Sequence, residues 1–454
     1  MTEGSAAGET AVKPSNRKPQ VLKGFRDYLP AQMRLRQQVI GRFREVFESH
    51  GFEQLDTPAI EYLEVLTGKA GENEKLMYAF EDHGGRRVGL RYDLTVPLAR
   101  VVAMHQSEIS LPFKRYHIAP VWRAEKPQRG RFREFWQCDA DIAGAPSPLA
   151  DAEIIAIMGE ALQAVGLPAF TIQISHRVVL ARIAVWAGVS EALASHVYRS
   201  VDKLAKIGRD AVLEEMTNGG IDRDAGTRIL DLIIDVAGRE DSLAEMGGAL
   251  RDDEIATQAL SELRQVFTVL PSLGITSERA VFDPTLARGL DYYTGVVFEA
   301  AVDEPRVGSV AGGGRYEELI GSFTNRSITA TGVSLGLERI LEVVNEFGLL
   351  PAESGSADAL VVALQSNLEA SAAIAREMRT TGLRIELSMQ PNRSIGDQLK
   401  YAAKKGIGYA IIAGGEELSR QEVSLKHLTT GEQRALSLAD AINVIRQSTE
   451  HRAQ

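Results

Sequence analysis

The sequence predicts an α+β fold: an antiparallel sheet flanked by helices, interrupted by a helical insertion and followed by a smaller α/β domain. Strand-like apolar patterns dominate 52–144 and 278–316, stripes of helical period dominate 178–270, and strands alternate with helices after residue 357. A chain of 454 residues exceeds what one hydrophobic core supports, so several domains are expected.

The expected division follows composition and periodicity. The small polar residues at the start predict a disordered tail, and Pro351 with Gly355 marks a linker. We expect a tail at 1–20, a sheet domain at 21–177 and 271–348, a helical insertion at 178–270, a linker at 349–356 and an α/β domain at 357–454.

In the first half, a helical apolar stripe predicts a helix over 32–50 that ends before Gly51. A short strand after it is broken by Pro58, which sheets tolerate only at edges or bulges. Segments 76–82 and 87–98 flank His83-Gly84-Gly85 and predict a hairpin. Paired strands are expected at 113–125 and 131–144, then a helix at 151–164.

In the second half, strands are expected at 278–285, 291–302 and 306–316, followed by a helix from near Gly332 that carries Leu335, Leu337, Ile340 and Leu341. In the last domain, the sequence predicts strands at 359–364, 383–389, 409–415 and 423–428, with helices at 367–382, 395–406 and 435–447. This order predicts a mostly parallel α/β sheet.

Composition places the chain among cytoplasmic globular proteins. No apolar run approaches the ~18 residues that cross a bilayer, and the first twenty residues lack the apolar core of a signal peptide. Cys138 is the single cysteine, which excludes an intramolecular disulfide and a cysteine zinc cluster. A net charge of −10 argues against unspecific coating of nucleic acid but leaves room for local basic patches.

Four segments carry unusual densities of arginine, acid, tyrosine and glycine on predicted strands: 90–100, 121–144, 287–299 and 311–340. Charged groups inside a sheet are costly unless they pair with each other or with a ligand. These segments therefore predict a site.

Those segments resemble a known family. WRAEKPQRGRFREF and GLER resemble motifs two and three of the class II aminoacyl-tRNA synthetases, and the first helix with GFEQLDTP resembles motif one. ARGLDYYTG and AGGGRYEEL resemble the two signature stretches of histidyl-tRNA synthetases, and the resemblance covers 21–454. RYDLTVPLAR and KRYHIAPVWR are closer to the eukaryotic and archaeal branch, because the commonest bacterial form has Pro-Glu where Tyr92-Asp93 stand.

The resemblance implies an ATP-dependent ligase that forms histidyl-adenylate and then transfers histidine to the 3′ end of histidine tRNA. It implies ATP with Mg²⁺ on its phosphates, a homodimer with motif one at the interface, an insertion that contacts the acceptor arm, and a C-terminal anticodon-binding domain. Two alternatives stay open: a regulatory paralogue that serves ATP phosphoribosyltransferase, and a class II synthetase for proline or threonine.

Arginines are the catalytic residues that the resemblance implies. Arg123 matches the arginine on the α-phosphate, Glu125 the acid on the adenine side of ATP, and Arg339 the arginine on the γ-phosphate. Planar guanidinium groups suit the charge that builds on phosphate oxygens. Arg288 matches an arginine near the α-phosphate and histidine; its alternative is an ion pair with Asp283 or Asp291.

For histidine itself, Asp93, Thr95 and Gln137 match positions that hold the α-amino group. Asp141 and Tyr293 match positions that read the ring. Tyr292 and Tyr316 are candidates for the same pocket, although tyrosines on strands more often serve packing. No protein side chain is assigned to a metal.

Two basic clusters are candidates for RNA binding. Beside the catalytic arginine lies a loop with Lys126, Arg129, Arg131 and Arg133, and the last domain carries Arg393, Lys400, Lys404 and Lys405. A solvated charged loop explains the first cluster equally well on composition alone, and for the second cluster a solvated helix face is the commoner meaning. Cys138 is interpreted as an inert packing group.

Overall fold

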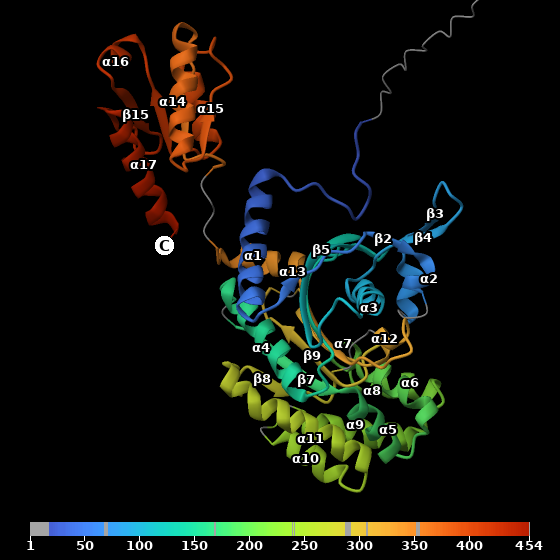
Figure 1. The fold of residues 1–454 in the computed structure, drawn as a ribbon. Coiled ribbons are helices and arrows are strands. Elements are labelled where there is room, and N and C mark those ends of the chain that lie inside the picture. Colours follow the sequence, from blue (N-terminus) through green and yellow to red (C-terminus); the bar gives the residue numbers. More distant parts are fainter. Residues whose placement is uncertain are drawn as a thin grey trace, which may run out of the picture. The chain divides into compact units, whose positions relative to one another are not determined.

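The structure is a computed structural model that describes residues 18–67, 71–167, 169–237, 239, 241–286, 292–305, 307–350 and 355–453. The chain divides into two compact units, Met1–Leu350 and Pro351–Gln454. Figure 1 colours both along the sequence. The predicted tail falls almost wholly outside the described residues, which begin at Lys18.

The first unit is built on an eight-stranded sheet with the order β1-β5-β6-β11-β10-β9-β7-β8. Its pairs are antiparallel except for β1 with β5 and β7 with β8. The strands before and after the helical segment lie in this one sheet, as the sequence predicted. Their bounds are β1 Glu53–Gln54, β5 Phe113–Trp122, β6 Glu134–Ala143, β7 Thr171–His176, β8 Ala280–Phe282, β9 Val296–Ala301, β10 Ser309–Tyr316 and β11 Ala330–Gly336.

A small three-stranded sheet and helix α3 precede β5. Strands β2 (Ile60–Tyr62) and β3 (Ala79–Glu81) pair with β4 (Arg87–Leu90), and short helices α2 (Leu63–Leu66) and η1 (Gly71–Leu76) lie between them. The predicted strand at 87–98 is wrong beyond Leu90, because α3 (Thr95–Met104) begins there. Asp93 Oδ1 accepts a hydrogen bond from the Val96 amide at 3.0 Å and starts the helix.

Figure 1 shows the large sheet curving around α3. The helix buries apolar residues around most of its circumference, so its sequence lacks the polar stripe that marks an amphipathic helix. That missing stripe explains the wrong prediction.

Helix α1 (Pro30–Ser49) contacts both α4 (Pro148–Ala164) and α13 (Leu337–Phe347), and all three helices contact the large sheet. A short helix, α12 (Glu318–Gly321), packs against α3. The prediction of a helix from near Gly332 is wrong for its first turn, because β11 extends to Gly336. β11 reads ATGVSLG, which shows no regular alternation of large apolar and polar residues, so its sequence lacks the two-residue period of a strand.

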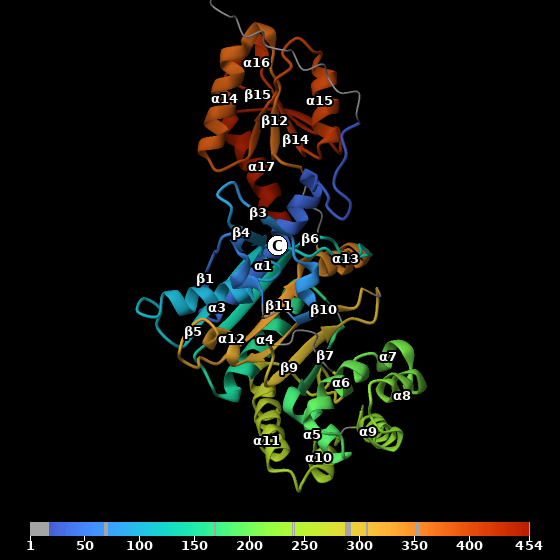
Figure 2. The same cartoon turned by 90° about the vertical axis from the view of Figure 1, so that its right-hand side faces the viewer.

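Between β7 and β8 the described chain is helical, as the sequence predicted for this segment. Figure 2 shows these helices gathered beyond β7. Their bounds are α5 Arg177–Trp186, α6 Glu191–Val201, α7 Leu204–Ile207, α8 Arg209–Asn218, α9 Arg223–Val236, α10 Ser242–Ala249, α11 Glu254–Val269 and η2 Leu270–Leu273. Throughout the described chain, no single helix combines the length and apolarity needed to cross a membrane; α5 and α6 reach them only as a pair bent by 113°.

The second unit holds a five-stranded sheet in the order β13-β12-β14-β15-β16. β13, β12 and β14 are parallel, whereas β15 and β16 are antiparallel. The predicted helix at 435–447 is wrong at its start, where β16 runs to Leu436. The bounds are β12 Ala359–Val361, η3 Gln365–Asn367, α14 Leu368–Thr380, β13 Ile385–Leu387, α15 Ile395–Lys404, β14 Tyr409–Ile412, α16 Gly415–Ser419, β15 Val423–His427, β16 Gln433–Leu436 and α17 Leu438–Ala453.

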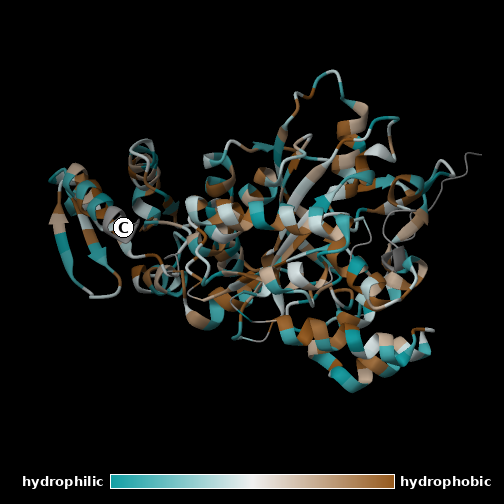
Figure 3. Ribbon diagram, turned by 90° about the horizontal axis from the view of Figure 1, so that it is seen from below, coloured by the Kyte–Doolittle hydropathy of each residue, from teal (hydrophilic) through white to brown (hydrophobic). Residues whose placement is uncertain are grey.

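Apolar burial holds each unit together. Figure 3 shows hydrophilic and hydrophobic residues alternating along the helices. In α13, Ile340, Leu341 and Val344 are buried, whereas Glu346 is exposed. A single apolar face of this kind fixes which side of the helix meets the sheet.

One buried ion pair ties β10 to α4. The Arg315 guanidinium lies 2.7 Å from Asp151 Oδ2 and also donates to the backbone carbonyls of Ala145 and Ser147. Both charged side chains are at most 5% exposed. Arg315 is therefore structural, which separates it from the neighbouring Tyr316 on the same strand.

Removing one member of this pair should destabilise the sheet unit strongly. Asp151→Ala leaves the Arg315 charge buried without its carboxylate, and we expect a loss of about 3–5 kcal/mol in the free energy of unfolding. Urea denaturation followed by tryptophan fluorescence measures it. Asp252→Ala is the control, because Asp252 is 94% exposed and faces Arg251 at 3.7 Å. Equal losses in the two variants would contradict the structural role of the pair.

Candidate functional site

A cavity of about 600 Å³ opens on the face of the large sheet that also carries α3. β6, β9, β10 and β11 contribute to it, together with the loop 123–132 and the start of α13. The predicted site residues among its lining are Thr95, Arg123, Glu125, Arg131, Gln137, Asp141, Tyr292, Tyr293, Tyr316 and Arg339. Sequence segments more than two hundred residues apart thus meet at one cavity.

Arg123 follows β5 and enters the cavity half-buried. Its Nε donates to the Tyr92 carbonyl at 2.9 Å, and its guanidinium carbon lies 5.1 Å from the centroid of the Phe135 ring. One nitrogen is thereby committed to the backbone, and the ring holds the plane of the group. The guanidinium is fixed in orientation before any ligand arrives.

Arg339 lies on the first turn of α13 and reaches the same cavity. Its Nη1 donates to the Ser309 carbonyl of β10. The preceding residue, Glu338, is buried and ion-pairs with Arg36 of α1 at 3.0 Å, and its Oε2 accepts from the Trp136 amide at 3.0 Å. These bonds fix the start of α13 and so place Arg339.

Glu125 and the basic loop lie beside Arg123. Arg131 is 3.6 Å from Glu125, and both line the cavity. Arg129 instead contacts Glu342 and Glu346 of α13 at 3.4 and 2.9 Å. Arg133 donates to the carbonyls of Glu125 and Lys23. Lys126 is exposed.

The loop is therefore not one open basic patch. Its arginines are largely engaged within the protein, and Arg131 is the member that the structure brings to the cavity. Sequence spacing gave no sign of the α13 acids that engage Arg129.

Asp141 is held from two sides at the end of the cavity near α12. Arg115, which is fully buried, approaches its Oδ2 at 2.7 Å, and the Tyr316 hydroxyl donates to its Oδ1 at 2.8 Å. Burial raises the pKa of Asp141, while Arg115 and the Tyr316 hydrogen bond oppose that rise. Arg115 was missed in the sequence, where it reads as one basic residue among several.

Three tyrosines form one cluster against this carboxylate. The Tyr292 ring lies 4.9 Å from Tyr293 and 5.8 Å from Tyr316, centroid to centroid. All three line the cavity. Burial raises the pKa of Tyr292 and of Tyr316 well above the usual value, so both hydroxyls keep their protons.

Of the three residues predicted to hold the α-amino group, two line the cavity and one does not. Thr95, at the start of α3, lines the cavity, and so does Gln137 on β6, whose Nε2 donates to Ser334 Oγ at 2.6 Å. Asp93 is 1% exposed and is not among the residues that line the cavity; its Oδ2 has no partner among the described residues. Burial raises the pKa of Asp93 to about 6.

Arg288 lies outside the described residues, which resume at Tyr292. Its convergence with Arg123 and Arg339 stays a prediction. Arg123 and Arg339, which stand 216 residues apart in the sequence, both line the cavity.

Asp139 was not predicted from the sequence. It lines the cavity between Gln137 and Asp141 on β6, where alternate residues face the same side. Period-two alternation from Gln137 would have indicated it. Among all the residues that the structure describes, no group of three or more histidine, cysteine, aspartate or glutamate side chains is arranged to hold a metal ion.

Cys138, which points to the other side of β6, is fully buried. Burial raises its pKa well above the usual value, as expected of an inert packing thiol.

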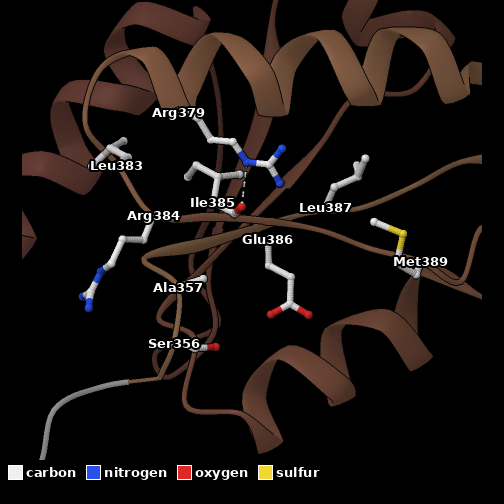
Figure 4. A pocket seen from close by; sticks show the side chains of 9 residues that line it. All are labelled: Ser356, Ala357, Arg379, Leu383, Arg384, Ile385, Glu386, Leu387 and Met389. Atoms are coloured by element: carbon white, nitrogen blue, oxygen red, sulfur yellow. Dashed lines mark hydrogen bonds between the residues drawn. The ribbon is translucent and has the colours of Figure 1, made fainter. Parts of the chain in front are cut away.

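A second cavity, of about 580 Å³, lies on the C-terminal unit beside the edge strand β13. Figure 4 shows Arg379 donating to the Ile385 carbonyl, a bond of 3.0 Å, with Arg384 and Glu386 on the same strand region. Arg384 ion-pairs with Asp358 at 2.9 Å, and Glu386 with Lys405 at 2.6 Å.

Of the basic residues predicted to form a strip in this unit, Lys405 is thus paired. Arg393, Lys400 and Lys404 are exposed or half-exposed on or beside α15. A solvated helix surface remains the open alternative for them.

The antiparallel sheet, its helical segment between β7 and β8, and a cavity with Arg123 after β5 and Arg339 on α13 define a class II aminoacyl-tRNA synthetase architecture. A family model described as histidyl-tRNA synthetase matches residues 24–340, and one described as anticodon binding domain matches 358–448. The chain belongs to the histidyl-tRNA synthetase family.

Individual relatives agree with that assignment. A histidine–tRNA ligase of Rhodopirellula baltica is 43% identical over 91% of this chain and 94% of its own length. A crystal structure of histidyl-tRNA synthetase from Nostoc sp. PCC 7120 matches with a TM-score of 0.83 and 33% identity, covering 95% of this chain and all of that one. A Bacillus halodurans structure described as an ATP phosphoribosyltransferase regulatory subunit/histidyl-tRNA synthetase matches with a TM-score of 0.74 at 25% identity, over 88% of this chain and all of that one.

Two glycines in the middle of strands β10 and β11 are required by close packing around Asp141 and not by a turn. A Cβ at Gly332 would lie 1.9 Å from Asp141 Oδ1, and one at Gly313 would lie 1.9 Å from the Gly332 carbonyl oxygen. Real Cβ atoms do not approach so closely, so both positions need glycine.

Gly332→Ala should displace Asp141 from Arg115 and lower the free energy of unfolding by about 1–3 kcal/mol, the usual cost of overpacking. Thermal unfolding measures it. Gly41→Ala is the matched control: a Cβ there meets nothing within 4 Å, and the change should stabilise α1 by about 0.5–1 kcal/mol. A neutral Gly332→Ala would show that Asp141 is not held by this contact.

Proposed function

We propose that this protein ligates histidine to histidine tRNA, first forming histidyl-adenylate from histidine and ATP and then transferring histidine to the 3′ end of the tRNA. One observation carries the proposal: Arg123 and Arg339 line the same cavity as Asp141 and Tyr293. Cationic groups for a triphosphate and polar groups for an imidazole thus share one cavity.

In the first step the histidine carboxylate attacks the α-phosphate, and pyrophosphate leaves. Arg123 meets the α-phosphate, where negative charge builds on the nonbridging oxygens, and Arg339 meets the γ-phosphate. Fixed donors of this kind lower the barrier because they need no reorganisation during the reaction. The Tyr92 and Ser309 carbonyls hold the two guanidinium groups. Glu125 meets the adenine side, and we propose Arg288 near the α-phosphate.

Recognition of histidine rests on buried polar groups. Thr95, Gln137 and Asp93 serve the ammonium, while Asp141 and Tyr293 serve the ring. Tyr292 and Tyr316 complete that end of the cavity, with Tyr316 holding Asp141. An apolar side chain of similar shape would leave these groups unpaired, a penalty that supports high selectivity.

Magnesium enters this proposal bound to the phosphates of ATP. Small divalent cations keep phosphate and water oxygens as ligands and need one or two protein carboxylates. Glu299 of β9 lines the cavity and is the carboxylate that we propose for it. The ion would neutralise the leaving pyrophosphate.

For the tRNA, we propose that 178–270 contacts the acceptor arm, that Arg131 with Lys126, Arg129 and Arg133 lies along its end, and that 357–454 binds the anticodon. Asp202, directly after α6, and Lys206 of α7 line the same cavity and support this placement of the helical segment. We further propose a cytoplasmic homodimer.

The regulatory alternative predicts no aminoacylation. The chain carries RGLDYYTG intact, and its second unit matches the anticodon binding domain. Both features favour the ligase. A synthetase for proline or threonine is disfavoured by Asp141 and its tyrosines.

Histidine-dependent exchange between pyrophosphate and ATP tests the activation step. The protein should catalyse exchange with histidine but not with proline or threonine. Arg123→Ala should lower kcat by about 10²–10³-fold, which is typical for loss of one charge-stabilising donor. Arg251→Ala, an arginine that is 78% exposed, should leave the rate unchanged. No exchange by the unmodified protein would favour the regulatory alternative.

A chain that ends at Leu350 tests the role of the second unit. Residues 1–350 form a compact unit of their own, so adenylate formation should survive, whereas charging of histidine tRNA should fall at least tenfold. Comparing exchange with charging on the same preparation separates the two steps. Equal losses would count against an anticodon-binding role for 357–454.

A further inference from the structure

Asp139 is a buried carboxylic acid in the cavity with an unused oxygen. It is 1% exposed and lines the cavity on β6. Its Oδ1 has no hydrogen-bond partner among the residues that the structure describes. An unsatisfied buried acceptor costs free energy, so a group of this kind in a cavity indicates a partner supplied by the ligand.

Asp139 forms no ion pair with any residue that the structure describes. His117 of β5 stands directly opposite it, and burial together with Arg115 and Arg91 lowers the His117 pKa to about 3, which keeps the ring neutral. Arg115 directs its Nη2 to Asp141 at 2.7 Å and to the Leu94 carbonyl at 3.2 Å, while its Nε and Nη1 have no hydrogen-bond partner among the described residues. The remaining charged groups near it, Asp93 and Asp141, are acids that raise its pKa.

Hydrogen bonds join Asp139 to the residues already proposed for the amino group. Ser334 of β11 lies opposite it on the other side and accepts from Gln137 Nε2 at 2.6 Å. The Ser334 hydroxyl is then directed to the carboxyl group of Asp139, where it favours the charged form. Gln137, Ser334 and Asp139 form one polar chain beside Asp93.

Building on the proposed function, we propose that Asp139 receives the α-ammonium group of bound histidine, whose positive charge pairs with this carboxylate. Two of the charged groups that act on Asp139, namely Asp93 and Asp141, are acids, whereas Arg115 is a cation. This local excess of carboxylates fits a primary ammonium group as the ligand. The ring of histidine is served elsewhere, by Asp141 with its tyrosines.

The protonation state of Asp139 makes the proposal measurable. Burial, with Asp141 and Asp93 nearby, raises its pKa to about 7, while Arg115 and Ser334 oppose the rise. An ammonium group binds the ionised carboxylate, so binding at pH 7 should release a proton to solvent. Affinity should therefore rise as pH increases through about 7.

Asp139→Asn removes the charge and keeps the size and the acceptor for Ser334. Two analogues of histidine test recognition of its ammonium and carboxylate groups independently. L-histidinol keeps the ammonium and lacks the carboxylate, whereas imidazolepropionate keeps the carboxylate and lacks the ammonium. In the full-length protein, the variant should bind histidinol at least tenfold more weakly, as expected for loss of one charge-assisted hydrogen bond. Imidazolepropionate should bind within about twofold of the parent, since it never meets this subsite.

Calorimetry in buffers of different ionisation enthalpy should show that the variant loses the Asp139 share of proton release. Thermal unfolding reports folding separately. A carboxylate whose folded pKa is raised destabilises the protein above its unfolded pKa, so Asp139→Asn should unfold at an equal or higher temperature at pH 7. Asp303→Asn, an exposed carboxylate after β9, should change none of these quantities.

Equal weakening of both analogues, or no weakening of histidinol, would overturn the assignment of Asp139. A lower unfolding temperature together with unchanged histidinol binding would show a structural role instead. These outcomes differ from failure of the proposed function, in which the unmodified protein would catalyse no histidine-dependent exchange.

Discussion

Ionised side chains on the concave face of the large sheet must be neutralised inside the protein, and this requirement shapes the cavity. Arg115 is fully buried between Asp141 and the Leu94 carbonyl, and Tyr316 holds the second oxygen of Asp141. β5, β6 and β10 each supply one of these side chains, and Gly332 of β11 leaves the space for them. The polar end of the cavity therefore forms only once the sheet has assembled, with its groups already oriented.

Ion pairs of the same kind place the phosphate-binding end. Glu338 joins α13 to α1 through Arg36 and to β6 through the Trp136 amide. Arg339 follows directly, so its position depends on contacts between residues about 300 positions apart in the sequence. Buried pairs add little net stability because desolvation offsets their attraction, but a broken pair is costly. Their effect here is to favour one arrangement of α1, β6 and α13.

Sequence patterns predicted α1 and the β5–β6 pair but misplaced two boundaries. The first turn of α3 was taken for the end of a strand, and β11 from Gly332 onward was taken for the start of a helix, because neither segment carries a clear period of its own. In the site, motif resemblance found Asp141, whereas Asp139 needed the alternation of β6. The pairing of Arg129 with Glu342 and Glu346 spans more than two hundred residues, and no local pattern encodes such a contact.

The strand β6 also sets the distance between the two ends of the cavity. Phe135 stacks under Arg123, and Asp141 follows six residues later on the same face. At a rise of about 3.3 Å per residue, roughly 20 Å separate the two positions along the strand. Phe135 and Asp141 stand on one rigid strand, so the proposed phosphate-binding and imidazole-binding ends are fixed relative to each other before the substrates bind.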